Sequence, residues 1–286
     1  MPEPFCFDPM ADLLLAESAA REAADHALWL STRGFETWAK GASDPVTTAD
    51  LEVDALLRER LLGARPGYGW LSEETADSLA RLEARALWVV DPIDGTRDYA
   101  RGRDGWAVSV ALAVDGEVVL GVLAAPALGH VYVATRDGAT LNGAPIRVSG
   151  REDESGMRLP VDPQFVAARL WERPWPAEAV PKPNSMALRI AMVASGAADG
   201  LVDARMTNEW DVAAASLVLE AAGGRSTDRE GAPFAFNKPE PEMLGIVAAT
   251  PALHAPLLDR LTEARAALKR MEVRIERDGP AERQEG

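Results

Sequence analysis

The sequence has a single cysteine, Cys6, and only three histidines among its 286 residues. One thiol excludes an intramolecular disulfide and a zinc site of the CxxC type, and it fits a reducing compartment, so we expect a cytoplasmic protein. Long hydrophobic runs are also missing. The longest apolar stretch, residues 118–128, contains glycine and proline and is too short to cross a bilayer. The N-terminus lacks the basic and apolar regions of a signal peptide, and we expect no membrane span.

Basic residues are scarce, because 30 lysines and arginines face 45 acidic residues and give a formal net charge of −15. Such a charge repels nucleic acid polymers and anionic lipids, so neither is an expected partner. An anionic substrate would need a local reversal of this field, and a bound metal ion is the commonest means. The 47% of hydrophobic residues supplies a sizeable core, in one large domain or two smaller ones.

Hydrophobic spacing and turn residues divide the first half of the chain into helical and extended stretches. Residues 8–30 and 49–62 repeat apolar side chains at helical spacing, and a polar loop is expected between them. Residues 86–90 predict a buried strand. Residues 106–135 predict a series of strands, with a hairpin turn at Asp115-Gly116.

Residues 150–184 interrupt this pattern, with six prolines between Pro160 and Pro183. We expect a boundary there, between an N-terminal α+β subdomain (1–150) and a C-terminal α/β subdomain (151–272). Residues 273–286 are rich in charge and are expected to be a disordered tail. The second half of the chain predicts helices at 185–195, 210–222 and 251–271 and a strand at 244–249.

The segment Asp91-Pro92-Ile93-Asp94-Gly95-Thr96 carries the most chemical information. Pro92 keeps Asp91 extended and Gly95 permits a sharp turn, so the two carboxylates can point into the same space. Carboxylates that close repel each other, and the arrangement suits a hard cation such as Mg²⁺. In isolation, a pair of turn-capping aspartates would be the commoner explanation.

Three other acidic positions change this interpretation. Glu73 lies in a Ser-Glu-Glu segment upstream of Asp91, Asp50 follows two threonines at the start of a predicted helix, and Asp211 follows Trp210. Taken singly, Asp50 and Asp211 could be favourable residues at helix N-termini, and Glu73 could be a solvated surface charge.

Together these segments resemble the inositol monophosphatase superfamily. DPIDGTRDY and WDVAAASLVLEAAGG match its two signatures, and the SEE and VTTAD segments match its remaining metal-site and water-site elements, in the right order over roughly residues 8–270. The resemblance implies a mixed α/β (α+β) fold with α-β-α-β-α layers, as in the inositol monophosphatases and fructose-1,6-bisphosphatases. It also implies a Mg²⁺-dependent phosphomonoesterase that binds two to three ions and is inhibited by Li⁺ and Ca²⁺.

The resemblance also implies roles for single residues. Glu73, Asp91 and the carbonyl of Ile93 would hold one Mg²⁺, and Asp91, Asp94 and Asp211 would hold a second. Most of these ligands fall in the N-terminal subdomain.

Catalysis would depend on three further assignments. Glu73 would reach a third, weaker ion through water. Thr96, paired with Asp50, would orient the attacking water, and the amides of Gly95 and Thr96 would hold phosphate oxygens. Phosphoryl transfer requires these parts, namely charge compensation, an oriented nucleophile and stabilisation of the leaving oxygen. The sequence contains no lysine-bearing P-loop of the kind that NTPases carry.

The resemblance implies a small phosphate ester as the substrate, and the motifs leave open which one. The residues after the DGT motif, 97–99, and the segment 208–211 resemble those of bacterial 3'(2'),5'-bisphosphate nucleotidases, which hydrolyse adenosine 3',5'-bisphosphate during sulfate assimilation. Ala204 stands where the inositol phosphatases place a sugar-binding glutamate. Arg189 and Lys238 are candidate partners for a second phosphate, although a helix-surface arginine would be equally ordinary.

Alternative functions remain open on the sequence. They are an inositol-1-phosphate phosphatase, a histidinol-phosphate phosphatase, and a binding protein that has lost turnover, against which the intact ligand set argues. The resemblance leaves both a monomer and a homodimer open.

Overall fold

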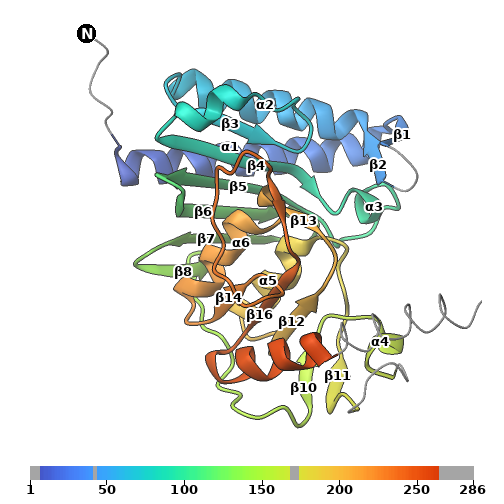
Figure 1. The fold of residues 1–286 in the computed structure, drawn as a ribbon. Coiled ribbons are helices and arrows are strands. Elements are labelled where there is room, and N and C mark those ends of the chain that lie inside the picture. Colours follow the sequence, from blue (N-terminus) through green and yellow to red (C-terminus); the bar gives the residue numbers. More distant parts are fainter. Residues whose placement is uncertain (1–6, 41–43, 168–173, 264–286) are drawn as a thin grey trace, which may run out of the picture.

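A sheet of seven strands forms the centre of the molecule, in a computed structural model that describes residues 7–40, 44–167 and 174–263 (Figure 1). β3 runs parallel to β4, and each later neighbour is antiparallel. The strands follow the chain across the sheet: β3 (Gly69–Ser72), β4 (Ala86–Asp94), β5 (Ala107–Val114), β6 (Glu117–Ala125), β7 (His130–Thr135), β8 (Gly138–Leu141) and β9 (Ala144–Pro145).

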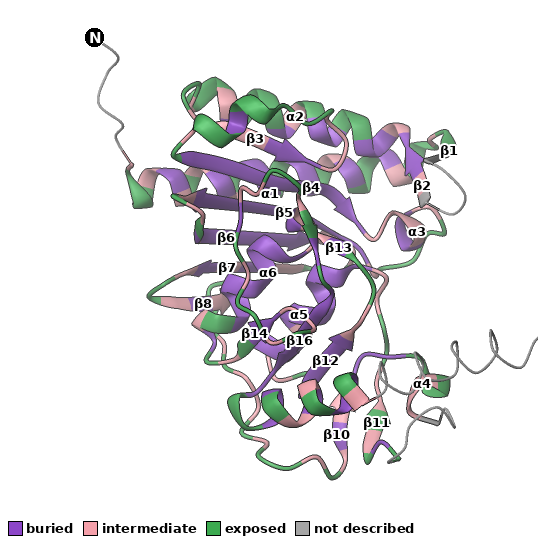
Figure 2. Cartoon of the chain, in the orientation of Figure 1, coloured by how far each residue is buried: buried purple, intermediate pink, exposed green. Residues whose placement is uncertain are grey.

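The middle strands are buried on both faces, as Figure 2 shows for β4, β5 and β6. Continuous runs of valine, leucine and alanine are typical of strands that helices cover on both sides. The strands predicted at residues 86–90 and within 106–135 are confirmed. So is the hairpin turn, where Asp115 and Gly116 have φ angles of 51° and 85°. The sequence did not predict β3, which is only four residues long.

Two long helices, α1 (Pro9–Arg33) and α2 (Thr48–Ala64), cover one face of this sheet. Alanines along α1 are fully buried and allow close packing. Both predicted helices are confirmed, and α2 continues past Gly63, where we expected it to end.

The expected polar loop between these helices is wrong. Residues 37–47 instead include an antiparallel pair of strands, β1 (Thr37–Lys40) and β2 (Asp44–Thr47). Val46 is buried in β2, which places an apolar anchor inside a stretch whose average composition is polar. β2 leads directly into α2, so the pair fixes the start of that helix.

The other face of the central sheet packs on α5 (Met186–Ala194) and α6 (Glu209–Ala221). Both helices are buried over nearly their whole length (Figure 2). A helix that is apolar all round belongs in the interior, and the helices predicted at 185–195 and 210–222 are confirmed in that position.

A second, three-stranded sheet lies beyond these helices, in the order β12 (Gly200–Asp203), β16 (Ile246–Ala249) and β14 (Arg225–Thr227). A helix over residues 251–263 packs on its outer side through Leu253, Leu257 and Leu261. The layers therefore run α-β-α-β-α, as Figure 1 shows from α1 down to this helix. The predicted fold class is confirmed, as is the strand expected near 244–249.

Short elements complete the described part of the chain: η1 (Leu79–Glu83), α3 (Thr96–Tyr99), η2 (Pro126–Leu128), β10 (Met157–Leu159), α4 (Pro163–Ala167), β11 (Ala177–Ala179), β13 (Thr207–Asn208) and β15 (Glu242–Met243). β10 pairs in parallel with β11, so the proline-rich stretch contains ordered structure. The boundary near residue 150 stays a prediction. The end of the helix expected at 251–271 and the tail at 273–286 lie outside the described residues.

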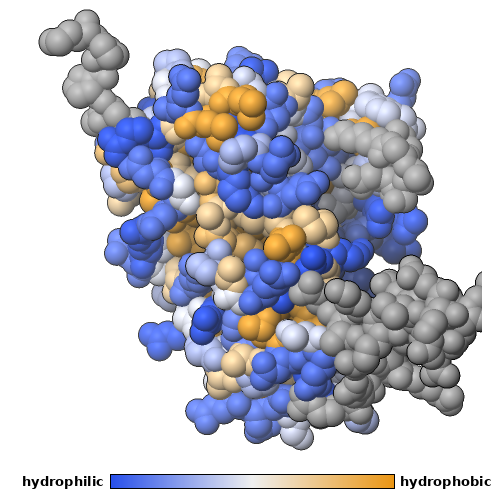
Figure 3. Space-filling model, in the orientation of Figure 1, coloured by the Kyte–Doolittle hydropathy of each residue, from blue (hydrophilic) through white to orange (hydrophobic). Residues whose placement is uncertain are grey.

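Within the described residues, no helix combines the length and apolar character that a membrane crossing needs. On the face drawn in Figure 3, apolar side chains form separate patches among hydrophilic ones.

Candidate metal centre

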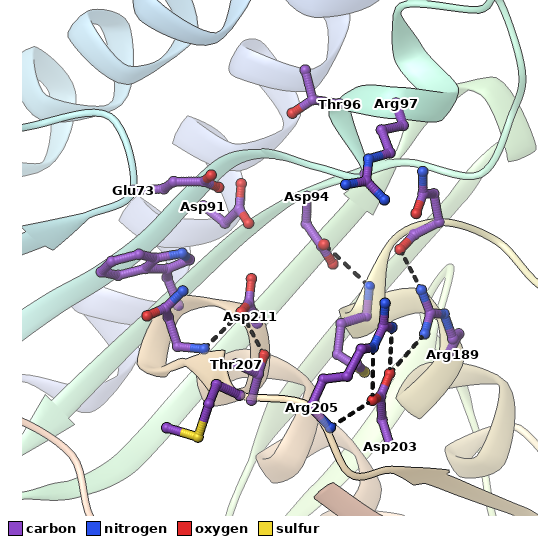
Figure 4. A pocket seen from close by; sticks show the side chains of 16 residues that line it. Glu73, Asp91, Asp94, Thr96, Arg97, Arg189, Asp203, Arg205, Thr207 and Asp211 are labelled. Carbon is purple, nitrogen blue, oxygen red and sulfur yellow. Dashed lines mark hydrogen bonds and ion pairs between the residues drawn. The ribbon is translucent and has the colours of Figure 1, made fainter. Parts of the chain in front are cut away.

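A polar pocket opens where the central sheet meets the N-terminal ends of three helices. It is lined by the end of β4, the start of α3, the start of α5 and the segment from β12 into α6 (Figure 4). The charged residues of its lining are Glu73, Asp91, Asp94, Arg97, Arg189, Asp203, Arg205 and Asp211.

Asp91 and Asp94 lie at the end of β4, where its register against β5 is interrupted between these two residues. This irregularity is the local reason that two carboxylates from one strand end reach the same pocket. Each side chain is nearly inaccessible to solvent. Asp91, Asp94 and Asp211 each offer a carboxylate oxygen, and the three oxygens lie within 4.8 Å of one another.

Asp211 comes from the first turn of α6 and is fixed there by a capping box. Its Oδ2 accepts a hydrogen bond of 2.7 Å from the backbone N–H of Asn208 and another from the hydroxyl of Thr207. The same carboxylate therefore caps the helix and lines the pocket.

Asp94 is held by the start of α5, far along the chain. Its oxygens accept from the hydroxyl of Ser185 (2.5 Å) and from the backbone N–H groups of Met186 (3.1 Å) and Ala187 (2.7 Å). Asp94 and Asp211 thus both lie at helix N-termini, whose unpaired N–H groups favour negative charge.

The pKa values of Asp91 and Asp94 are raised, because these carboxyl groups lie away from solvent and close to other negative charges. Burial, and then the nearby carboxylates of Glu73, Asp94 and Asp211, hold the pKa of Asp91 well above its usual range. Burial and the charge of Asp211 raise the pKa of Asp94 to about 7, against the opposing effect of its three hydrogen bonds. Closely packed oxygen ligands that resist ionisation suit a hard divalent cation, so the residues present fit Mg²⁺.

Asp50 and Thr96 meet at the edge of the pocket, although they are far apart in the sequence. The hydroxyl oxygen of Thr96 lies 3.0 Å from Oδ1 of Asp50 and 3.0 Å from the carbonyl oxygen of Ile93. The other Asp50 oxygen accepts from the backbone N–H (2.7 Å) and the hydroxyl (2.6 Å) of Thr47. Burial raises the pKa of Asp50.

Gly95 cannot be replaced at this turn without strain. Its φ of 97° lies in the left-handed region, and a Cβ would come within 2.7 Å of the carbonyl oxygen of Gly105 and 2.9 Å of the Ser185 nitrogen. The close approach brings the start of α3 against the start of α5.

The model of the inositol monophosphatase family matches residues 12–266 of the sequence. The chain belongs to this family. Its members are metal-dependent phosphatases, so the protein is an enzyme of that kind.

Individual relatives carry different names. The inositol-1-monophosphatase of Rhizobium meliloti is 35% identical over 201 residues, which cover 67% of this chain and 75% of that protein. The 3'-phosphoadenosine 5'-phosphate phosphatase of Mycobacterium bovis is 33% identical over 223 residues (75% and 81%). The IMPase structure of Thermotoga maritima superposes with a TM-score of 0.79 at 26% identity, over 90% of this chain and 99% of that one.

The pocket of this family phosphatase has a cationic side that the sequence reasoning found only in part. Arg97, Arg189 and Arg205 lie with Asp203 on the side away from Glu73 and Asp91 (Figure 4). The sequence did not predict Asp203 and Arg205, because they belong to neither family signature and reach the pocket only through the connection from β12 to β13.

Arg189 is buried, not solvent-facing, and burial lowers the pKa of its guanidinium. It donates to the carbonyl oxygens of Pro183 (2.8 Å) and Asn184 (2.7 Å) and lies 3.6 Å from Asp203. Arg205 pairs with both oxygens of Asp203 and is largely exposed. Lys238 is not part of the pocket lining. Its ammonium group donates to the carbonyl oxygen of Glu242, so the structure does not bring it to the other candidates.

Proposed function

We propose that this enzyme is a Mg²⁺-dependent phosphomonoesterase that hydrolyses adenosine 3',5'-bisphosphate to AMP and phosphate. The observation that carries the choice of substrate is the charge distribution in the pocket. Asp91, Asp94 and Asp211 cluster where ions would bind, Glu73 lines the same pocket, and the rest of the charged lining consists of three arginines and one aspartate.

This distribution separates the candidate substrates. Two divalent ions would balance the four carboxylates, and one phosphate of the ester would bind to those ions. The arginine side keeps its positive excess, which favours a substrate with a second anionic group. Inositol 1-phosphate offers only neutral hydroxyls there, and histidinol phosphate offers an amine that arginines repel.

The acidic residues of the pocket divide into ligands for separate ions in this proposal. Glu73, Asp91 and the carbonyl of Ile93 would hold one Mg²⁺, and Asp91, Asp94 and Asp211 would hold a second. Glu73 would reach a third, weaker ion through water. The ions, when bound, favour deprotonation of the attacking water and offset the charge on the leaving oxygen.

The remaining residues position the reactants. The Thr96 hydroxyl donates to the fixed Asp50 carboxylate, so its lone pairs accept a hydrogen bond from the attacking water and orient that water towards phosphorus. The backbone N–H groups of Gly95 and Thr96, at the start of α3, hold phosphate oxygens. One proton of the attacking water passes to the Thr96–Asp50 pair as the water oxygen adds to phosphorus. The bond to the 3'-oxygen breaks, and that oxygen takes a proton from solvent water, to which the Thr96–Asp50 pair returns the proton it received.

In this proposal, arginine side chains bind the second phosphate of the substrate. A guanidinium has five N–H donors, and the contacts of Arg205 with Asp203 use its Nε and Nη2 groups. Arg189 lies behind Asp203 and supports the same region. A charge-assisted contact to phosphate contributes roughly 1.5–3 kcal/mol, or about ten- to a hundredfold in binding.

A phosphate-release assay with three substrates tests the proposal. We expect kcat/KM for adenosine 3',5'-bisphosphate to exceed that for inositol 1-phosphate and histidinol phosphate by at least about tenfold. Chelation of divalent ions should abolish activity, and Li⁺ should inhibit it. Full activity after exhaustive chelation would refute the metal mechanism.

Two arginine variants locate the specificity. Arg205→Gln and Arg189→Ala should raise KM for the nucleotide alone, whereas Arg136→Gln, an exposed arginine paired with Glu117, should change nothing. Equal effects of Arg189→Ala on all substrates would make that arginine structural.

Inositol-1-phosphate phosphatase is the second candidate, because the relative in Rhizobium meliloti carries that name at 35% identity. A higher kcat/KM for inositol 1-phosphate would establish it in place of the nucleotidase. For the nucleotidase, the proposal extends to a cytoplasmic role in sulfur assimilation, where this bisphosphate is removed.

A further inference from the structure

Arg81, in η1, joins two segments that are distant in the sequence. The residue is buried, and its Nε and Nη2 groups donate to the two carboxylate oxygens of Asp77 at 2.7 and 2.9 Å. The same guanidinium donates to Oδ1 of Asn237 (2.8 Å) and to the carbonyl oxygen of Lys238 (2.8 Å). A planar arginine bonded on two sides fixes both segments in relative position.

Glu209, the first residue of α6, holds the same distant loop from the other side. Its side chain is completely buried, and its two oxygens accept from the backbone N–H groups of Asn237 (2.7 Å) and Lys238 (2.9 Å). Its own backbone N–H donates to the carbonyl oxygen of Pro241 (2.9 Å). Residues 237–238 are therefore bonded to Arg81 and to Glu209 at once.

This connection joins the segments that carry two candidate metal ligands. Asp211 follows Glu209 in the first turn of α6, and Glu73 precedes Asp77 in the segment after β3. The Glu73 segment is fixed separately, because Ser72 and Thr75, on either side of Glu73, both donate to the carboxylate of Asp54.

We propose that Arg81 and Glu209 are positioning residues, which act through residues 237–238 to hold the first turn of α6, and with it Asp211, in place beside the Glu73 segment. Neither residue lines the pocket. The restraint matters because the clustered carboxylates repel one another, and without this connection that repulsion would move the start of α6, with Asp211, away from Asp91 and Asp94. The inference rests on the metal site proposed above, and it explains what holds the ligands of that site in place.

Direct binding of Mg²⁺ to the full-length, metal-free protein tests the inference without substrate. Isothermal titration calorimetry compares wild type with Arg81→Gln, Arg81→Lys and Glu209→Gln. We expect each variant to raise the Mg²⁺ dissociation constant about tenfold, since partners behind metal ligands commonly contribute ten- to a hundredfold. Arg81→Lys keeps the positive charge and loses the paired N–H donors of the guanidinium, so it is the variant to measure if Arg81→Gln does not fold.

Three comparisons decide the outcome. Arg85→Gln is the matched control, because Arg85 pairs with both oxygens of Asp115 at an exposed site and should leave Mg²⁺ affinity unchanged. The double variant Arg81→Lys/Glu209→Gln should bind little worse than either single variant, because both act through one loop. A lowered melting temperature with Mg²⁺ affinity within about twofold of wild type would overturn the inference.

The metal site itself is checked independently. Asp211→Asn should lose Mg²⁺ binding, and unchanged binding in that variant would refute the site, not the positioning role alone.

Discussion

The pairing of Thr96 with Asp50 predicts that the two residues act as one unit in catalysis. Their oxygens lie 3.0 Å apart, and the far oxygen of Asp50 is fixed by both donors of Thr47. Asp50 therefore has a single direction in which to orient the Thr96 hydroxyl. Removing either partner leaves the attacking water without an oriented acceptor.

The size of the effect follows from the loss of one general-base contact. Thr96→Ala and Asp50→Asn should each lower kcat by about a hundredfold, the lower end of what such groups contribute. A hundredfold corresponds to about 2.7 kcal/mol in activation free energy. The double variant should also be about a hundredfold slower, so the coupling energy should be about 2.7 kcal/mol. Independent residues would give about ten thousandfold.

Phosphate release at saturating substrate and Mg²⁺ measures these values, with Thr96→Ser as the control that keeps the hydroxyl. Asp50 also accepts the backbone N–H of Thr47 in the capping box of α2, so Asp50→Asn should cost about 1 kcal/mol of stability. Rates are therefore compared well below the melting temperature of every variant. If the losses in activation free energy of the two single variants add in the double variant, or if Thr96→Ser is as slow as Thr96→Ala, Thr96 and Asp50 do not act as one unit.

Three further predictions follow from the same geometry. The raised pKa values of Asp91 and Asp94 mean that the folded, metal-free protein binds more protons than the unfolded chain. Its melting temperature in chelator should therefore fall as pH rises from about 4 to about 7. Asp91→Asn should flatten that dependence. Mg²⁺ binding should release protons below pH 7, which calorimetry in buffers of different ionisation enthalpy detects. Gly95→Ala should lower the free energy of unfolding by well over 2 kcal/mol, because the new Cβ would lie 2.7 Å from the Gly105 carbonyl oxygen. Gly102→Ala, where φ is 64° and a Cβ meets open space, should lower it by about 1–2 kcal/mol. Chemical denaturation measures both values.

The central part of the fold and most of the carboxylate cluster could be predicted from the sequence, because both depend on local patterns. Unbroken apolar runs identified β4 to β6, and alanine-rich helical spacing identified α1 and α6. Asp91 and Asp94 come from one strand end, so their proximity followed from spacing. The family signature then added Asp211, which the structure brings within 4.8 Å of both.

What the sequence did not reveal depends on contacts between distant segments. The β1–β2 pair is stabilised by pairing and by the burial of Val46, neither of which local composition reports. A solvent-facing arginine on a helix was an equally ordinary expectation for Arg189, yet carbonyl groups of the preceding segment and Asp203 surround it. Lys238 carried the right charge in a loop whose direction only the tertiary structure defines.

The carboxylates of the pocket and the arginines opposite them belong to different parts of the fold. The carboxylates lie at a strand end and at two helix N-termini, where hydrogen bonds to the backbone fix them. The arginine side instead includes residues 203–206, which join β12 to β13 ahead of α6. Substitutions there change the charge that meets the rest of the substrate and leave the carboxylate hydrogen bonds intact. Relatives at 32–35% identity are named as phosphatases of three different phosphate esters. Substrate choice in this enzyme should therefore respond to changes at Arg205, whereas the metal requirement should not.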